Sequence, residues 1–227
     1  MSIREKSTRL EGYRIAHCVT GSVAAIEAPK IARELRRHGA HVQAYMSKDA
    51  SKIIHPNSME FATDEKVVTE ITGGMEHLMN FDLVLVAPAT ASTISKMAVG
   101  IADSPVTALA LATDAKIIIA PSMALRMYEK SILQENIAKL EKAGYVFLEP
   151  RIAEGKAKLA AINELVDAVI EEFTAKDLNS SNVTVTAGPT VEYIDPIRVI
   201  TNKSSGKMGI EMAKEAHRRG ANVRLIY

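Results

Sequence analysis

The sequence of 227 residues contains a single cysteine, Cys18, no tryptophan and only 4% aromatic residues. One cysteine cannot form an internal disulfide, so a disulfide framework is excluded and we expect a reducing, cytoplasmic compartment. The scarcity of aromatic rings and the formal net charge of +1 argue against a nucleic-acid partner. No apolar run is long enough to cross a bilayer, and the charged N-terminus lacks the apolar core of a signal peptide, so no membrane partner is expected.

What is present is typical of a globular protein with an apolar core, because 47% of the residues are hydrophobic and 24% are charged. Short apolar runs alternate with amphipathic stretches. The predicted strands are residues 13–19, 41–46, 82–87, 116–120 and 145–148. The predicted helices are residues 24–37, 92–112 with a break at Pro105, 132–143 and 162–173. This alternation predicts an α/β fold with a doubly wound, Rossmann-like parallel sheet.

A polar stretch at residues 174–182 predicts a linker between a first domain, residues 1–173, and a second segment, residues 183–227. The second segment repeats an earlier pattern, because residues 215–227 resemble residues 34–46: the end of a helix, a glycine stop and a strand. We therefore expect the start of a second Rossmann-like domain whose sheet is not completed. So short a segment buries little apolar surface by itself, and we expect it to be a fragment of a longer chain or disordered.

Two turns at predicted strand ends could bind a ligand. Gly21 and Ser22 follow the first strand at a helix start, where free backbone N–H groups suit a phosphate. Taken alone, a plain turn with a capping serine explains them better, because the three-glycine dinucleotide fingerprint is absent. Residues 88–93 add small and hydroxyl side chains after the third strand, although a capped helix start explains Ser92 equally well.

Two further features are ambiguous by themselves. His77 precedes the third strand and could act as a general base, but an ordinary surface or core histidine explains it equally simply. Met123 and Met127 follow the fourth strand, where they could line a site or fill the core at helical spacing.

Taken together, these pieces are far more specific than any of them alone. Segments 21–25, 87–91 and 121–128, with the His77 segment, resemble the homo-oligomeric flavin-containing cysteine decarboxylases. The likeness is greatest to bifunctional coenzyme A biosynthesis proteins, which join a phosphopantothenoylcysteine decarboxylase to a phosphopantothenate–cysteine ligase. Residues 13–173 resemble the decarboxylase, and residues 183–227 resemble the ligase through segments 186–190, 195–198 and 201–209.

The resemblance implies FMN-dependent decarboxylation of 4′-phosphopantothenoylcysteine to 4′-phosphopantetheine, in which FMN oxidises the cysteinyl side so that CO₂ leaves readily. It implies a homotrimer or dodecamer, with CTP and Mg²⁺ serving the ligase of the longer protein. His77 is the implied catalytic base. The implied flavin contacts are Gly21, Ser22, Val23, Ser47, Ala89, Thr90, Ser92 and Thr107. The implied substrate contacts are Met123, Ala124 and Met127, with Asn202 contacting the acyl-cytidylate of the ligase.

The sequence departs from this family in two places. Ala124 stands where the family has an asparagine thought to hold the substrate carboxylate, and the nearest cations in sequence, Arg126 and Lys130, are expected to face solvent. Residues 149–156 lack the cysteine of the longer bacterial flap, and Cys18, in the first strand, cannot replace it. The alternatives are a non-catalytic flavin-binding regulatory protein and a flavin prenyltransferase, the latter disfavoured by the ligase-like segment. We expect the ligase half to be inactive in a chain that stops at Tyr227.

Overall fold

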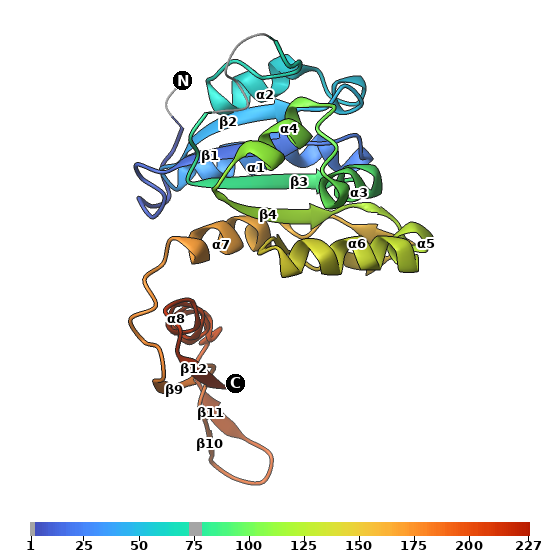
Figure 1. Ribbon diagram of the computed structural model, residues 1–227. Helices are drawn as coiled ribbons and strands as arrows, with labels where there is room; N and C mark the ends of the chain where they lie inside the picture. Colours follow the sequence, from blue (N-terminus) through green and yellow to red (C-terminus); the bar gives the residue numbers. More distant parts are fainter. Residues whose placement is uncertain (1–2, 73–78) are drawn as a thin grey trace. The chain divides into compact units, whose positions relative to one another are not determined.

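The computed structural model describes residues 3–72 and 79–227 and divides into two compact units, Met1–Ile170 and Glu171–Tyr227. The first unit is built on a five-stranded sheet with the order β2-β1-β3-β4-β6, in which every pairing is parallel (Figure 1). Its strands are β1 (Arg14–Val19), β2 (His41–Met46), β3 (Leu83–Ala89), β4 (Lys116–Pro121) and β6 (Val146–Phe147). The predicted parallel, doubly wound sheet is confirmed, and the strand order reverses between β1 and β3.

Proline and glycine set the ends of the helices. The predicted helix at residues 24–37 begins as a 3-10 turn, and its α-helical part has Pro29 in its first turn, where a missing N–H costs nothing. The predicted helix at residues 92–112 is two helices, because Gly100 ends the first in a left-handed conformation and Pro105 starts the second. The helices and 3-10 turns of this unit are η1 (Val23–Glu27), α1 (Ala28–Arg37), η2 (Ala50–Lys52), α2 (Pro56–Thr63), α3 (Ala91–Val99), α4 (Pro105–Ala112), α5 (Leu125–Tyr128), α6 (Ser131–Lys142) and α7 (Ile162–Glu172).

Alternate side chains of the central strands enter cores on the two faces of the sheet. On one face, Cys18, Val86 and Ile119 belong to a buried cluster that also contains residues of α3, α4 and α6. Their neighbours in sequence, such as His17 and Leu85, point to the opposite face and are also fully buried. Because β1, β3 and β4 are covered on both sides, their sequences are almost continuously apolar, which is why they could be identified from sequence.

A second, smaller sheet in the first unit was not predicted. It has the order β5-β8-β7 and consists of β5 (Met123–Ala124), β7 (Arg151–Ala153) and β8 (Lys156–Lys158). Strands β7 and β8 form an antiparallel hairpin whose turn places Glu154 and Gly155 at positive φ. Strand β5 pairs with β8 so that Met123 faces Ala157 and Ala124 faces Lys156.

The second unit contains β9 (Asn182–Thr186), β10 (Val191–Tyr193), β11 (Val199–Thr201), α8 (Lys207–Arg218) and β12 (Asn222–Ile226). Strands β9 and β12 form a parallel pair, and β10 and β11 form an antiparallel pair. Helix α8 begins close to the end of β9, because a Cβ at Gly209 would lie only 2.7 Å from the Cβ of Ala187. This βαβ arrangement repeats β1, α1 and β2, as the sequence echo predicted. Within the described part of the chain, no helix combines the length and apolarity needed to cross a membrane.

Candidate functional site

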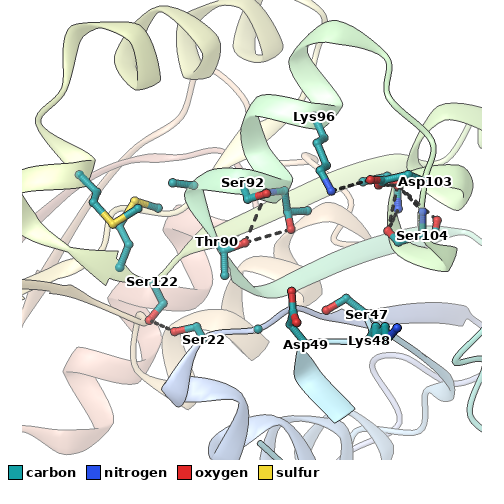
Figure 2. A pocket seen from close by; sticks show the side chains of 16 residues that line it. Ser22, Ser47, Lys48, Asp49, Thr90, Ser92, Lys96, Asp103, Ser104 and Ser122 are labelled. Atoms are coloured by element: carbon teal, nitrogen blue, oxygen red, sulfur yellow. Dashed lines mark hydrogen bonds and ion pairs between the residues drawn. The ribbon is translucent and has the colours of Figure 1, made fainter. Parts of the chain in front are cut away.

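A cavity of about 530 Å³ lies at the carboxyl ends of the strands of the main sheet, next to the point where the strand order reverses. Such a position is the usual ligand site of an open α/β sheet. Residues that follow β1, β2, β3 and β4 all reach it, as do residues of α3 and α4 (Figure 2). Its lining residues are Gly21, Ser22, Ser47, Lys48, Asp49, Thr90, Ala91, Ser92, Thr93, Lys96, Asp103, Ser104, Thr107, Ser122, Met123 and Met127.

Hydrogen bonds hold the ends of β1 and β3 together beneath this cavity. The buried Thr20 hydroxyl donates to the carbonyl oxygen of Pro88 at 2.7 Å and accepts from the backbone N–H of Thr90 at 3.0 Å. The hydroxyl of Ser22 donates to that of Ser122 at 3.0 Å, and so connects the turn after β1 to the end of β4 (Figure 2). These hydrogen bonds fix the ends of β3 and β4 relative to the turn at Gly21, so this part of the cavity wall is preorganised.

Gly21 is required by a close approach of two backbones. A Cβ at this position would lie 2.5 Å from the Cβ of Asp49, in the loop after β2. Non-bonded carbon atoms do not approach each other so closely, so a side chain at position 21 would push this loop and the neighbouring Ser47 away. The glycine thus keeps the turn after β1 and the loop after β2 in contact at the edge of the cavity.

Three helical segments begin at the cavity. Ser22, Thr90 and Ser104 cap η1, α3 and α4, and each hydroxyl accepts a backbone N–H of the first turn, at 3.4, 3.3 and 3.2 Å respectively. Helix N-termini carry a partial positive charge and free N–H groups, which favour an anionic ligand such as a phosphate. The hydroxyl side chains at the same places can donate further hydrogen bonds to it.

Three charged side chains of the cavity lining, Asp49, Lys96 and Asp103, are held in ion pairs. Lys96 of α3 binds Asp103 at 2.6 Å, and this hydrogen bond holds the pKa of the Asp103 carboxyl below its usual range (Figure 2). Lys52 binds Asp49 at 2.7 Å and lowers the pKa of that carboxyl in the same way. Both acids therefore stay ionised at neutral pH, and neither is suited to act as a general acid there.

A second cavity of about 430 Å³ adjoins the first, because Ser22, Ser122 and Met123 line both. It lies over the small sheet rather than the main one. Its other lining residues are Val23, Ala24, Glu27, Ala124, Arg151, Lys156, Ala157, Lys158 and Leu159. The two cavities together offer a hydroxyl-rich compartment beside a cationic one.

The structure brings most of the residues singled out from sequence to these two cavities. Gly21, Ser22, Ser47, Thr90, Ser92, Thr107, Met123 and Met127 line the first cavity, and Val23 and Ala124 line the second. Ala89 does not line either; it is buried at the end of β3, where its carbonyl oxygen accepts the N–H of Ser122 at 2.9 Å. Asn202 belongs to the second unit, where it is exposed and its side-chain oxygen accepts the N–H of Ser204. His77 lies outside the described residues.

Thr90 and Thr107 line the first cavity and also cap helices. Thr90, and not Ser92, caps α3. The Thr107 hydroxyl accepts the backbone N–H of Ser104 at 3.1 Å and so completes a capping box at the start of α4. Thr107 therefore shapes the cavity wall whether or not it also contacts a ligand.

Sequence reasoning missed Lys96, Asp103, Ser104 and Ser122 as cavity residues. Ser104 could have been found, because a serine directly before a proline is a helix-start signal. The pairing of Lys96 with Asp103 bridges the loop between α3 and α4, and no local pattern reveals it.

Comparison with known proteins gives two family matches. Residues 3–174 match the family model described as Flavoprotein, and residues 178–227 match that of the DNA/pantothenate metabolism flavoprotein C-terminal domain. A coenzyme A biosynthesis bifunctional protein CoaBC of Thermococcus kodakarensis is 55% identical over 97% of this chain and 57% of its own length. The protein of the same name from Methanocaldococcus jannaschii is 41% identical over 97% of this chain and 56% of its own length. The chain thus spans a little over half the length of these relatives.

A solved structure adds a match in three dimensions. The crystal structure of the FMN-dependent cysteine decarboxylase SpaF superposes with a TM-score of 0.66 at 28% identity, over 72% of this chain and 98% of that one. The Flavoprotein match covers well over half of the chain, so this protein belongs to the flavoprotein family.

Proposed function

We propose that this chain binds FMN in the hydroxyl-lined cavity and decarboxylates 4′-phosphopantothenoylcysteine to 4′-phosphopantetheine. The observation that supports this best is the gathering of Gly21, Ser22, Ser47 and Thr90 at one cavity where helices begin. The family resemblance of the sequence implies the same residues as flavin contacts. The names of the relatives, coenzyme A biosynthesis and FMN-dependent cysteine decarboxylation, point to the same chemistry.

The residues present fit FMN. Hydroxyls, backbone N–H groups and helix N-termini suit its phosphate and ribityl chain, and the thioether side chains of Met123 and Met127 suit an aromatic ring. The volume of about 530 Å³ lies within the range of cofactor sites, about 300–1,000 Å³. When bound, the flavin supplies the two-electron oxidation that activates the substrate for loss of CO₂. The protein residues position both molecules and exclude water, and His77 is proposed to move the proton.

Other features are proposed for the longer protein and its assembly. The segment at residues 178–227 matches the C-terminal domain of pantothenate metabolism flavoproteins, which supports a CTP- and Mg²⁺-dependent ligase activity in the full-length protein, with Asn202 at its site. A homotrimer, or a dodecamer of such trimers, is proposed as the assembly. The exposed apolar side chains of Val23 and Ile26, on η1 beside the second cavity, suit a contact between subunits.

The decisive experiment is CO₂ release from 4′-phosphopantothenoylcysteine by the wild type and a His77→Asn variant, with His217→Asn, an exposed histidine of the second unit, as control. We expect His77→Asn to abolish CO₂ release while the visible flavin spectrum is retained, and the control to remain active. Wild-type protein that holds flavin but releases no CO₂ would favour a non-catalytic flavin-binding protein of the same fold instead.

A further inference from the structure

The second cavity has a charge pattern that the flavin site does not explain. Three cations line it, Arg151, Lys156 and Lys158, and all three come from the β7–β8 hairpin. Among the residues that the structure describes, Glu27 is the only carboxylate in its lining, and it forms an ion pair with Lys30 at 3.1 Å. An excess of positive charge in a concave site attracts anions.

The three cationic side chains differ in the hydrogen bonds and ion pairs that they already form. Lys158 binds Glu154 at 2.6 Å, and the Nε of Arg151 donates to the carbonyl oxygen of Leu159 at 3.0 Å. For the Lys156 side chain, the described residues offer neither a hydrogen bond nor an ion pair. Lys156 is therefore the cation with the most capacity left for a ligand.

Strand register fixes where Lys156 stands. Ala124 and Lys156 are direct partners in the antiparallel β5–β8 pair, and directly opposed side chains of such a pair lie on the same face of the sheet. Ala124 has only a methyl group, so the space beside the Lys156 side chain is not filled from the opposite strand. Both residues line the second cavity.

The cations lie in the part of the second cavity that the first does not share. The shared residues are Ser22, Ser122 and Met123, which are hydroxyl-bearing or apolar, whereas the cations belong to the hairpin. A substrate that reaches the flavin through the shared part would thus direct its far end toward Lys156. A carboxylate due to leave as CO₂ gains nothing from a strong ion pair, because holding it in the ground state raises the barrier to its loss.

We propose that Lys156, with Arg151 beside it, forms a subsite for the phosphate monoester at the far end of the substrate. This inference rests on the proposed function and adds to it the residues that select a phosphorylated over a non-phosphorylated substrate. A dianionic phosphate has several acceptor oxygens, so it can use an ammonium and a guanidinium at once. The substrate's apolar arm then spans the distance between this subsite and the flavin cavity.

The test is equilibrium binding of 4′-phosphopantetheine and of pantetheine to the FMN-loaded protein, by calorimetry, in the wild type, Lys156→Gln and the control Lys130→Gln. Lys130 is an exposed lysine that lines neither cavity. We expect the wild type to prefer the phosphorylated ligand, and Lys156→Gln to bind it roughly tenfold or more weakly, as for loss of one charge-assisted hydrogen bond. Pantetheine affinity, and both affinities of the control, should change less than twofold.

Two results would overturn the subsite. Neither ligand has a carboxylate, so unchanged affinity of Lys156→Gln for 4′-phosphopantetheine would remove the phosphate role and leave the substrate carboxylate as the group for Lys156. An equal loss for both ligands would mean that Lys156 contacts the shared arm. A separate assay of CO₂ release distinguishes failure of the phosphate subsite from failure of the proposed decarboxylase activity. If the protein released no CO₂ but still preferred the phosphorylated ligand in a way that depends on Lys156, the subsite would stand and the decarboxylase activity would be refuted.

Discussion

His17 should make the stability of the first unit depend on pH between 6.5 and 4. This side chain is fully buried in β1, and its Nε2 lies 2.8 Å from the carbonyl oxygen of Ala87. Because a carbonyl oxygen can only accept, Nε2 carries the proton, and Nδ1 has no hydrogen-bond partner among the described residues. Protonating Nδ1 would bury both a charge and an unpaired donor, and burial accordingly lowers the pKa of His17 from 6.5 to about 4.

The sign and size of the effect follow from this lowering. Above pH 6.5 the histidine is neutral in both the folded and unfolded states, so its contribution does not change. Below pH 6.5 the unfolded chain binds a proton that the folded one rejects, so stability falls with pH until the folded pKa near 4 is reached. Each tenfold difference in proton affinity is worth about 1.4 kcal/mol, so the loss is about 2 kcal/mol by pH 5 and about 3 kcal/mol in total.

The assay is urea unfolding followed by circular dichroism, since the chain has no tryptophan to report by fluorescence. The variant His17→Gln keeps an amide N–H for the Ala87 carbonyl oxygen but does not titrate. We expect the free energy of unfolding of the wild type, relative to this variant, to fall by about 2 kcal/mol between pH 7.5 and pH 5. The control His41→Gln replaces an exposed histidine that pairs with Glu65, and exposed pairs contribute little. The reasoning would be refuted if the free energy of unfolding had the same pH dependence in the wild type and in His17→Gln. It would also be refuted if His41→Gln changed this pH dependence as much as His17→Gln does.

Three further results are expected. Ser104→Ala removes the side-chain cap of α4 and should lower the free energy of unfolding by about 1 kcal/mol in thermal unfolding at neutral pH, whereas no change would mean that the cap is not used. Cys18 is buried and its burial raises the pKa of its thiol, so Ellman's reagent should label it only after denaturation; rapid labelling of native protein would contradict its position. Sedimentation equilibrium of the FMN-loaded protein should give about three copies per particle or a multiple of three, and a monomer at micromolar concentration would argue against the proposed assembly.

The main sheet could be predicted because its strands are buried on both faces. Such strands are continuous apolar runs between glycine or polar turns, and the predicted strand at residues 41–46 matches β2 at both ends. The predicted helix break at Pro105 is confirmed, because α4 starts there, whereas the end of α3 at Gly100 was not predicted. The small sheet was missed because β5 and β8 are only two and three residues long and pair across a long stretch of chain. Strands of two or three residues are too short to show the alternation of apolar and polar residues that identifies a strand in a sequence.

The candidate site could be predicted to the extent that it follows strand ends. Gly21, Ser22 and Thr90 come directly after buried strands, so their convergence follows from a parallel sheet. Lys156 could not be found in this way. Its place opposite Ala124 depends on the register of two short strands. Arg126 and Lys130, the cations nearest to Ala124 in sequence, are exposed, as expected, and line neither cavity.

The visible absorbance spectrum of the purified protein, recorded during titration of the flavin-free chain with FMN, tests the central claim most directly. The cavity at the carboxyl edge of the main sheet predicts flavin bands in the visible that shift on binding and saturate at one FMN per chain. Gly21→Ala, which would force the Asp49 loop away, should weaken this binding. A spectrum identical to that of free FMN at every ratio, with no FMN retained on gel filtration, would contradict the account.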